Sequence, residues 1–282
     1  MKLNSRVEIR RSTITQIVNI LDEIIAAKKA RLVEVKRTKP LELLRQEAQV
    51  ARRTAQSHAL RKAVKESSRL NIIAEFKRRS PSKGIIRAEV DPAVIASAYE
   101  RGGAAAISVL TEQDYFDGSL DDLAAVRQAT MLPLLRKDFV FDEYQVYEAA
   151  DARADALLLI VAALSDDQLT RLRVTAEDEL GLDALIEVHT SEELKRAVAA
   201  GARLIGVNNR DLRTFKVSLD ISLQLASEAP GDVLLVSESG LNSRTDLQQL
   251  QAVGFKGFLI GESLMRAEEP AEALRALLGG VG

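Results

Sequence analysis

The pattern of apolar and polar residues changes character near residue 70 of this 282-residue chain. Before that point, apolar residues recur at helical spacing over residues 13–39, and Pro40 ends the pattern. A second short helix is predicted over residues 41–50. We therefore expect residues 1–69 to form a helical extension that packs on a main domain comprising residues 70–282.

After residue 70, eight short apolar runs alternate with eight helical stretches. The predicted strands are residues 71–76, 105–110, 132–135, 156–161, 184–188, 204–207, 233–237 and 257–260. The predicted helices are residues 92–101, 120–130, 143–153, 166–180, 191–200, 219–228, 244–253 and 271–278. Eight strand–helix units predict an α/β fold, the (β/α)8 TIM barrel. A doubly wound open sheet is the alternative, but no GxGxxG motif follows the first strand.

Composition and charge exclude several classes of function. A formal net charge of −2 argues against general nucleic-acid binding, which usually requires a strongly basic surface. No apolar run reaches the roughly 20 residues of a membrane helix, and the N-terminus lacks the apolar segment of a signal peptide. We expect a cytoplasmic protein, with a monomer favoured, that binds neither membranes nor nucleic acid. One basic cluster is interpreted as a solvated helical face; it comprises Arg52, Arg53, Arg61, Lys62 and Lys65.

The absence of cysteine and the presence of only two histidines limit metal chemistry. Without cysteine there can be no disulfide, no thiolate metal site and no cysteine nucleophile. Neither His58 nor His189 has a second ligand at helical spacing, so no metal site is expected. His189 is interpreted as a residue whose hydrogen bonds are satisfied at the start of a helix.

Charged and amide side chains gather where the predicted strands run into the following helices. Glu75 and Lys77 are two positions apart at the end of the first strand, so both side chains point to the same side. A (β/α)8 barrel carries its active site at this end, where a buried charge needs a partner or a substrate. Other such residues are Lys137, Glu187, Asn208, Arg210, Glu238 and Ser239. The alternative is a structural ion pair at the rim, either Glu75 with Lys77 or Lys137 with Asp138.

Glycines after the last two strands predict a phosphate site. Loops at these two places often bind phosphate through backbone N–H groups, and glycine lets the main chain approach the anion. Gly240 and Gly261 occupy these positions, and the loop that contains Ser80 could reach the same anion. A single glycine after a strand is a weak signal, but two at the expected strand ends favour a phosphorylated small molecule as the ligand.

Eight segments, in this order and spacing, resemble the indole-3-glycerol phosphate synthase family of tryptophan biosynthesis. They are IIAEFKRRSPSKG, AISVLTEQDYFDGSLDDL, PLLRKDF, LLLIVAAL, ALIEVH, IGVNNRDL, SESGL and FLIGESLMR. The resemblance covers nearly the whole chain. It implies a (β/α)8 barrel that converts 1-(2-carboxyphenylamino)-1-deoxyribulose 5-phosphate to indole-3-glycerol phosphate, carbon dioxide and water without a cofactor.

The resemblance also implies roles for the charged residues. Lys137 matches the general acid that protonates the ketone of the sugar chain as the ring closes. Lys77 would lie nearby, and two close ammonium groups are expected to depress at least one lysine pKa. Glu187 matches the general base of the dehydration step. Glu75 and Glu238 match carboxylates that hold the lysines and the substrate hydroxyls.

Further residues match the remaining parts of the family site. Asn208 is a polar positioning group, and Ser239 follows Glu238 in the catalytic set. The expected substrate-binding residues are Ser80, Gly240, Gly261 and Glu262 at the phosphate, Phe116, Phe139, Leu158 and Leu212 around the anthranilate ring, and Arg210 in support. Glu262 departs from members that have a small hydroxylated residue there, which puts the part of its side chain in phosphate binding in doubt.

Two other functions are alternatives. One is another phosphosugar barrel enzyme such as phosphoribosylanthranilate isomerase, but that enzyme relies on a cysteine base that this chain lacks. The other is a non-catalytic subunit that binds a phosphorylated ligand. Such a subunit would be expected to have lost some of the matched acids and bases, and all of these are present: Glu75, Lys77, Lys137 and Glu187.

Overall fold

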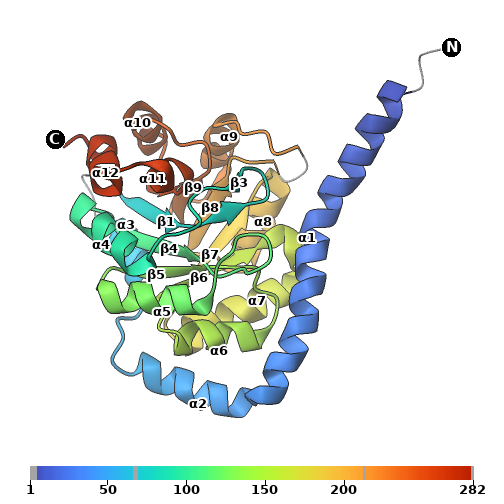
Figure 1. Ribbon diagram of the computed structural model, residues 1–282, viewed down its shortest axis with the longest axis vertical. Coiled ribbons are helices and arrows are strands. Elements are labelled where there is room, and N and C mark those ends of the chain that lie inside the picture. The colour runs from blue at the N-terminus through green and yellow to red at the C-terminus, as the bar shows by residue number, and fades with distance from the viewer. Residues whose placement is uncertain (1–4, 66–68, 212–213, 281–282) are drawn as a thin grey trace.

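A computed structural model describes the backbone of residues 5–65, 69–211 and 214–280, and the side chains of these residues from residue 20 onward. Within these ranges, eight parallel strands close into a barrel in the order β1-β10-β9-β8-β7-β6-β5-β4, and β4 pairs again with β1 (Figure 1). The strands are β1 Ile72–Phe76, β4 Ala106–Leu110, β5 Leu134–Lys137, β6 Ala156–Ile160, β7 Asp183–Val188, β8 Leu204–Asn208, β9 Leu234–Glu238 and β10 Phe255–Ile260. The (β/α)8 prediction is confirmed, and the open sheet is excluded.

Helices connect the strands and cover the outside of the barrel (Figure 1). They are α4 Pro92–Gly102, α5 Leu120–Ala129, α6 Glu143–Asp151, α7 Asp166–Val174, α8 Ser191–Ala199, α9 Asp220–Glu228, α10 Arg244–Ala252 and α12 Pro270–Leu278. Many begin where a side-chain oxygen accepts a hydrogen bond from the first turn, as Asp91 does for α4 and Ser119 for α5. The sequence therefore fixes where these helices start.

Several short elements lie in loops where the apolar pattern predicted none. The loop after β1 forms a small hairpin of β2 Arg79–Ser80 and β3 Gly84–Ile85, and α11 Glu262–Arg266 follows β10. A 3-10 turn, η1 Val161–Ala163, follows β6. These elements hold only two to five residues each, which is too few to show a periodic pattern.

Several predicted boundaries differ from the structure, and for two of them the structure shows the physical reason. The third barrel strand, β5, runs two residues past its last apolar residue to Lys137, because Arg136 on this strand is buried in an ionic network rather than exposed. The helix predicted over residues 166–180 ends at Val174 and continues as a π-helical turn, Thr175–Glu179. This turn directs Glu177 inward, where it accepts hydrogen bonds from the Ala184 backbone N–H and from Arg173.

The N-terminal extension comprises α1 Ser5–Thr38, α2 Leu41–Arg52 and α3 Ala59–Lys65, of which α3 was not predicted. Helix α2 packs on α6. Helix α3 closes the end of the barrel at which the strands begin: Leu60 and Val64 are fully buried in the cluster that fills the barrel interior. The extension contacts the barrel through α2 and α3, and the division into an extension and a barrel domain at residue 69 stays a prediction.

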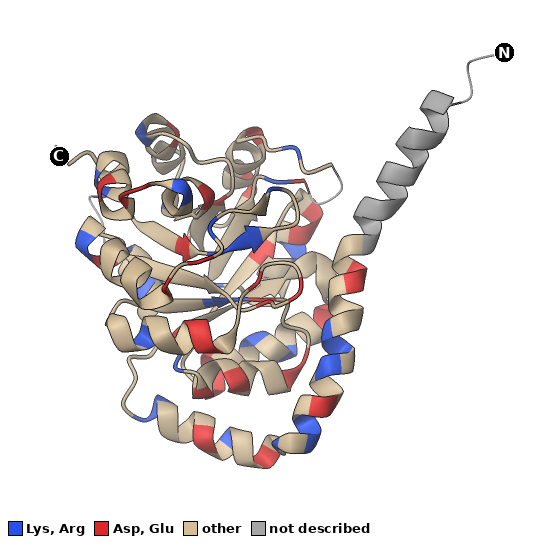
Figure 2. Cartoon of the chain, in the orientation of Figure 1, with Lys and Arg blue, Asp and Glu red and all other residues tan. Residues whose placement is uncertain are grey.

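Helix α1 is held against the barrel by ion pairs with opposite charges on its loops (Figures 1 and 2). Lys28 Nζ lies 2.6 Å from Asp138 Oδ1, whose side chain is almost completely buried. Further along the chain, Arg31 pairs with Asp114 at 2.9 Å, and two more lysines pair in the same way; these are Lys36 with Asp142 and Lys39 with Asp151, both at 2.8 Å. The C-terminal part of α1, from Lys28 onward, and Lys39 just after it are therefore held to the barrel by ion pairs.

The interpretation of the basic cluster as a solvated face is wrong for two of its members. The Arg52 side chain is 6% exposed and donates hydrogen bonds to the carbonyls of Ala154, Leu180 and Gly181. The Arg61 side chain is 18% exposed, and its Nε lies 3.5 Å from Asp183 Oδ1. Buried carbonyls and carboxylates at the start of the strands need such donors, and the sequence pattern does not show them.

Candidate active site

A large cavity of about 1420 Å³ opens at the end of the barrel where the strands run into their helices. Every predicted site residue from the described part of the chain lines it, including both lysines, the four predicted glutamates and the glycines after β9 and β10. Leu212, predicted to contact the anthranilate ring, lies outside the described residues. The barrel therefore brings together side chains that are up to 187 positions apart, from Glu75 to Glu262.

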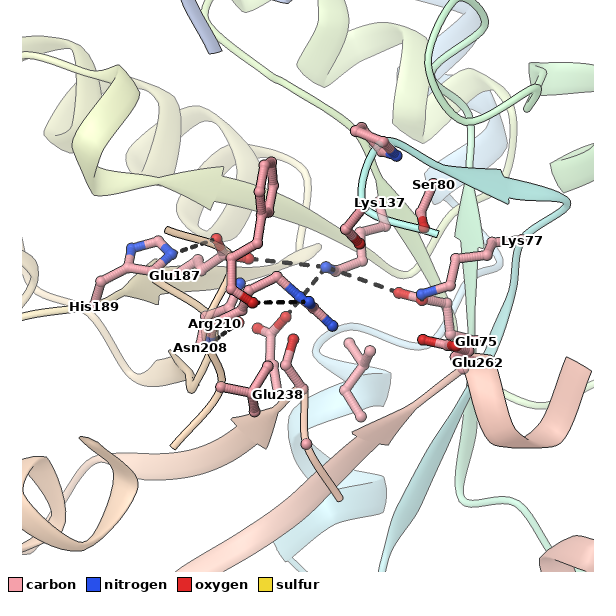
Figure 3. A pocket seen from close by; sticks show the side chains of 18 of the residues that line it. Glu75, Lys77, Ser80, Lys137, Glu187, His189, Asn208, Arg210, Glu238 and Glu262 are labelled. Carbon is pink, nitrogen blue, oxygen red and sulfur yellow. Dashed lines mark hydrogen bonds and ion pairs between the residues drawn. The ribbon is translucent and has the colours of Figure 1, made fainter. Parts of the chain in front are cut away.

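Lys137 lies at the centre of this cavity, among three carboxylates (Figure 3). Its Nζ is 3.2 Å from Glu238 Oε2 and 3.8 Å from an oxygen of both Glu75 and Glu187. These four side chains come from the ends of β5, β9, β1 and β7, so the closed barrel points them at one another. The site thus holds a cation that a substrate oxygen can approach.

Burial by itself would lower the pKa of Lys137, but the charges of Glu238, Glu75 and Glu187 outweigh it and hold this pKa above the ordinary value. For Lys137 the expected depression by Lys77 is therefore wrong in direction. Lys77 is near, as predicted, but its Nζ pairs with Glu75 Oε1 at 2.5 Å. The arrangement keeps Lys137 protonated in the free site.

The surrounding glutamates differ in acidity although all are buried. Burial raises the pKa of Glu238 to about 7; the Lys137 charge opposes this rise and the Glu187 charge adds to it. Burial also acts on Glu187, but the contact with the His189 ring at 3.3 Å and the charge of Lys137 lower its pKa to about 2. For Glu75, burial is outweighed by the charges of Lys77 and Lys137, so its pKa is below the ordinary value. Glu238 is thus the carboxyl group that exchanges a proton near neutral pH.

Two glycines make room for these carboxylates. A methyl group on Gly206, in β8, would overlap Glu238 Oε1, and one on Gly261, after β10, would collide with Glu75 Oε1. Gly261 was predicted from its place in a phosphate loop, and the structure adds this second reason for a glycine there. Gly206 was not predicted, because a glycine inside a strand gives no sign of which side chain approaches it.

Backbone turns and small polar groups form one edge of the cavity. Ser239 and Gly240 both have positive φ angles, of 67° and 76°, which turn the chain sharply after β9. Asn209 stabilises this turn because its Nδ2 donates to the carbonyl of Ser239 at 3.0 Å. Ser80 lies on the hairpin after β1, and Glu262 follows Gly261 (Figure 3). These loops offer backbone N–H groups of the kind that bind phosphate.

Charge near this edge is mixed. Glu262 Oε1 accepts a hydrogen bond from Arg266 Nε at 3.2 Å, and Lys83 Nζ lies 3.9 Å from the same oxygen. Arg210 also lines the cavity, and its guanidinium donates to the carbonyl of Phe215 at 3.3 Å. Lys83 lies in the basic loop of Ser80 that was expected to reach the anion, whereas Arg266 was not predicted; both bring positive charge to the edge where the phosphate was expected.

The opposite edge is apolar. The rings of Phe116 and Phe139 lie with centroids 6.2 Å apart, and Leu158 lines the same cavity. Helix α1 adds Ile20 and Ile24, which were missed because a helix that precedes the barrel by some 50 residues gives no local sign of facing its site. One side of the cavity therefore suits an aromatic ring and the other an anion.

His189 is a further residue that sequence reasoning left out of the site. Its backbone N–H is bonded at the start of α8, as predicted, but its ring lines the cavity beside Glu187 (Figure 3). The available signal was its position two residues after Glu187, the spacing that places Lys77 beside Glu75.

Comparison with known proteins identifies the family. The family model for indole-3-glycerol phosphate synthase matches residues 21–277 of the chain. The chain belongs to the indole-3-glycerol phosphate synthase family. The resemblance seen in the eight sequence segments is thereby confirmed.

Curated relatives of this family match over most of their length. The indole-3-glycerol phosphate synthase of Carboxydothermus hydrogenoformans is 45% identical over 264 residues, which cover 92% of this chain and 99% of the relative. That of a Polaromonas species is 44% identical over 93% of this chain and 98% of its own. That of Desulfosudis oleivorans is 52% identical over 73% of this chain and 78% of its own.

A solved structure agrees on the fold alone. Thiamine phosphate pyrophosphorylase from Pyrococcus furiosus superposes with a TM-score of 0.56 at 17% identity, over 74% of this chain and 93% of that one. Among the residues that the structure describes, no helix has both the length and the apolar character needed to cross a membrane.

Proposed function

We propose that this protein is a carboxy-lyase that forms indole-3-glycerol phosphate from 1-(2-carboxyphenylamino)-1-deoxyribulose 5-phosphate, with loss of carbon dioxide and water, in tryptophan biosynthesis. Family membership supports the reaction. The chemical observation that supports it most directly is Lys137, a cation 16% exposed to solvent and 3.2–3.8 Å from three carboxylates, between an apolar wall and an anion-binding edge. No cofactor is part of this proposal.

The substrate has two ends that suit the two sides of the cavity. Its anthranilate ring would lie against Phe116, Phe139 and Leu158, and its phosphate would lie at the loops of Ser80, Gly240 and Gly261, with the Glu262 backbone N–H. This orientation carries the sugar ketone over Lys137, midway between the two sides. Arg210 and Asn208, which also line the cavity, would position the chain of hydroxyls.

Lys137 would act first, as the general acid. When the ring carbon that bears the carboxylate attacks the ketone carbon, negative charge develops on the ketone oxygen. Lys137 gives that oxygen a proton, and its raised pKa ensures that it carries the proton when the substrate binds. Lys77 and Glu75, paired at 2.5 Å, would hold the neighbouring part of the substrate.

Two eliminations complete the reaction. The bond to the carboxylate breaks, carbon dioxide leaves and the electron pair returns to the ring. The hydroxyl formed in the first step then leaves as water with a proton donated by a lysine, while Glu187 takes a proton from the adjacent carbon. Glu238, 3.2 Å from Lys137, and Ser239 beside it would orient the lysine and the substrate during these steps.

The test is to mix the purified protein with this substrate, without added metal or cofactor, and to follow indole fluorescence. Product should form at an enzyme-like rate, and Lys137→Ala should reduce turnover by about 10²–10⁴-fold with a small change in KM, because the lysine acts mainly in the transition state. The matched control is Lys256→Ala, a lysine on β10 with an exposed side chain. Near-normal turnover of Lys137→Ala would remove it as the acid.

The same experiment distinguishes the alternatives. Tight substrate binding without product would favour the non-catalytic subunit that binds a phosphorylated ligand. Absence of both binding and product would favour another phosphosugar barrel enzyme. A cytoplasmic monomer that binds no nucleic acid remains our prediction.

A further inference from the structure

His189 has a carboxylate at each of its two ring nitrogens. Nε2 lies 3.3 Å from Glu187 Oε1, and Nδ1 lies 3.2 Å from Glu193 Oε2. A neutral imidazole has one N–H group and one lone pair, so one of its nitrogens would face a carboxylate lone pair to lone pair. In the imidazolium form the ring can donate from Nδ1 to Glu193, and its positive charge pairs with Glu187 at Nε2. The surroundings of the ring therefore select its charged form.

The backbone holds this arrangement in place. Glu193 lies in the first turn of α8, and its Oε2 also accepts the His189 backbone N–H at 2.7 Å. The Glu193 backbone N–H in turn donates to Thr190 Oγ1, the side chain that caps α8, at 3.2 Å. The His189 side chain is only 9% exposed. The ring is thus fixed between the end of β7 and the start of α8.

This contact divides the two oxygens of Glu187 between two cations. Oε1 is taken by His189, which leaves Oε2 facing Lys137 at 3.8 Å and the interior of the cavity. The carboxylates of Glu75, Glu187 and Glu238 then face the cations Lys77, Lys137 and His189. Without the imidazolium, Glu187 would be a third carboxylate competing for Lys137.

We propose that His189 is a positively charged positioning residue that keeps Glu187 ionised and directs its Oε2 toward Lys137 and the substrate. The acidities of the site agree with this role. Burial alone would lower the pKa of His189, but hydrogen bonds and charges from Glu187 on β7 and Glu193 on α8 raise it to about 10. Glu238 is closer to Lys137 than Glu187 is, yet its pKa is about 7 and that of Glu187 about 2.

The charge of His189 can be read directly by nuclear magnetic resonance, because the full chain contains only two histidines. In protein labelled with ¹³C and ¹⁵N at histidine, the variant His58→Gln assigns the remaining signals to His189. We expect both ring nitrogens of His189 to stay protonated from about pH 6 to 9, above the ordinary histidine pKa of about 6.5. In Glu187→Gln the ring should titrate at least about one unit lower than in the unchanged protein. A ring that titrates near its ordinary pKa, or is neutral at neutral pH, overturns the proposal.

A kinetic comparison tests the positioning role and rests on the proposed function. His189→Gln should lower kcat by about 10- to 100-fold, the value of one hydrogen bond to a charged group, with KM changed much less. The matched control is His58→Gln, whose ring contacts Leu182 and Asp183 at the opposite end of the barrel and which should keep normal kcat. Normal kcat in His189→Gln overturns the role. If the unchanged protein made no indole product, the proposed function would fail, and the resonance titration would still report the charge of His189.

Discussion

Glu75, Glu187 and Glu238 are similarly buried, but each faces a different set of cations. Glu75 has Lys77 at 2.5 Å, and Glu187 lies between His189 and Lys137. Glu238 has only Lys137 within 4 Å among the cations of the described residues, and the other two carboxylates repel its charge. The differences in acidity therefore come from the partner of each side chain, and they separate residues of one type into different roles.

The raised pKa of Glu238 predicts a pH dependence of activity. If Glu238 must be ionised to orient Lys137, kcat/KM should rise with pH and level off above about pH 7, the pKa of this group. In Glu238→Gln the remaining activity should lose this acidic limb. Rate profiles from about pH 5.5 to 9 would check this. An acidic limb that persists unchanged in Glu238→Gln would contradict it.

The same shift predicts the direction of a stability change. Because the folded state raises the pKa of Glu238 from 4.5 to about 7, the folded protein binds more protons than the unfolded chain between these values. The ionisation of Glu238 therefore lowers the free energy of unfolding as pH rises through that window. Glu238→Gln should remove this decrease. Urea unfolding at about pH 5 and pH 8 should show that the variant gains stability relative to the unchanged protein at the higher pH.

Gly206 offers a separate test of how Glu238 is placed. Its φ is not in the left-handed region, so Gly206→Ala leaves the backbone unstrained, and the new methyl group meets Glu238 Oε1. We expect turnover to fall by about tenfold or more as the carboxylate is displaced from Lys137. Gly231→Ala, where a methyl group meets no atom within 4 Å, is the control. Normal turnover in Gly206→Ala would show that the position of Glu238 is not critical.

At the scale of secondary-structure elements, helix α1 contributes to the cavity because it packs against the barrel. It lies across the loop side of the barrel, where Ile20, Leu21 and Ile24 line the cavity. Its contact closest to the chemistry is Lys28 with Asp138, the residue next to Lys137. Asp138 also pairs with Arg136 at 3.1 Å, so its carboxylate keeps a cationic partner if α1 moves away.

Lys28→Met should therefore weaken substrate binding without unfolding the protein. The loss of one hydrogen bond to a charged group predicts a rise in KM of about tenfold or more, with thermal stability changed little. Arg37→Met is the matched control, since Arg37 pairs with Glu34 within the same helix and both side chains are exposed. A KM equal to that of the control would show that α1 does not need this ion pair to complete the cavity.

At the scale of the whole molecule, the N-terminal extension serves both ends of the barrel. Helix α1 borders the cavity, while α3 closes the opposite end with Leu60 and Val64. The Asn71 Nδ2 of the barrel also donates to the Val64 carbonyl at 2.9 Å. The extension is thus in part an internal component of the barrel.

Two truncations separate these functions. Deleting residues 1–39 should leave a folded barrel that binds substrate poorly. Deleting residues 1–66 exposes the interior around Leu60 and Val64, each worth roughly 1.5–3 kcal/mol when buried, against a total stability of about 5–15 kcal/mol. We expect the longer deletion to unfold, as measured by circular dichroism and thermal melting. A cooperative melt of the longer deletion would show that α3 is dispensable.

The sequence by itself determined the alternation of strands and helices, and with it the barrel and the set of residues at the strand ends. This was possible because period, capping and strand-end position are local properties of the chain. Only the tertiary structure decided the roles within that set. The acidities of Glu187 and Glu238, the charge of His189 and the contributions of α1 and α3 depend on which groups lie within about 4 Å across the closed barrel, since electrostatic and packing energies fall steeply with distance.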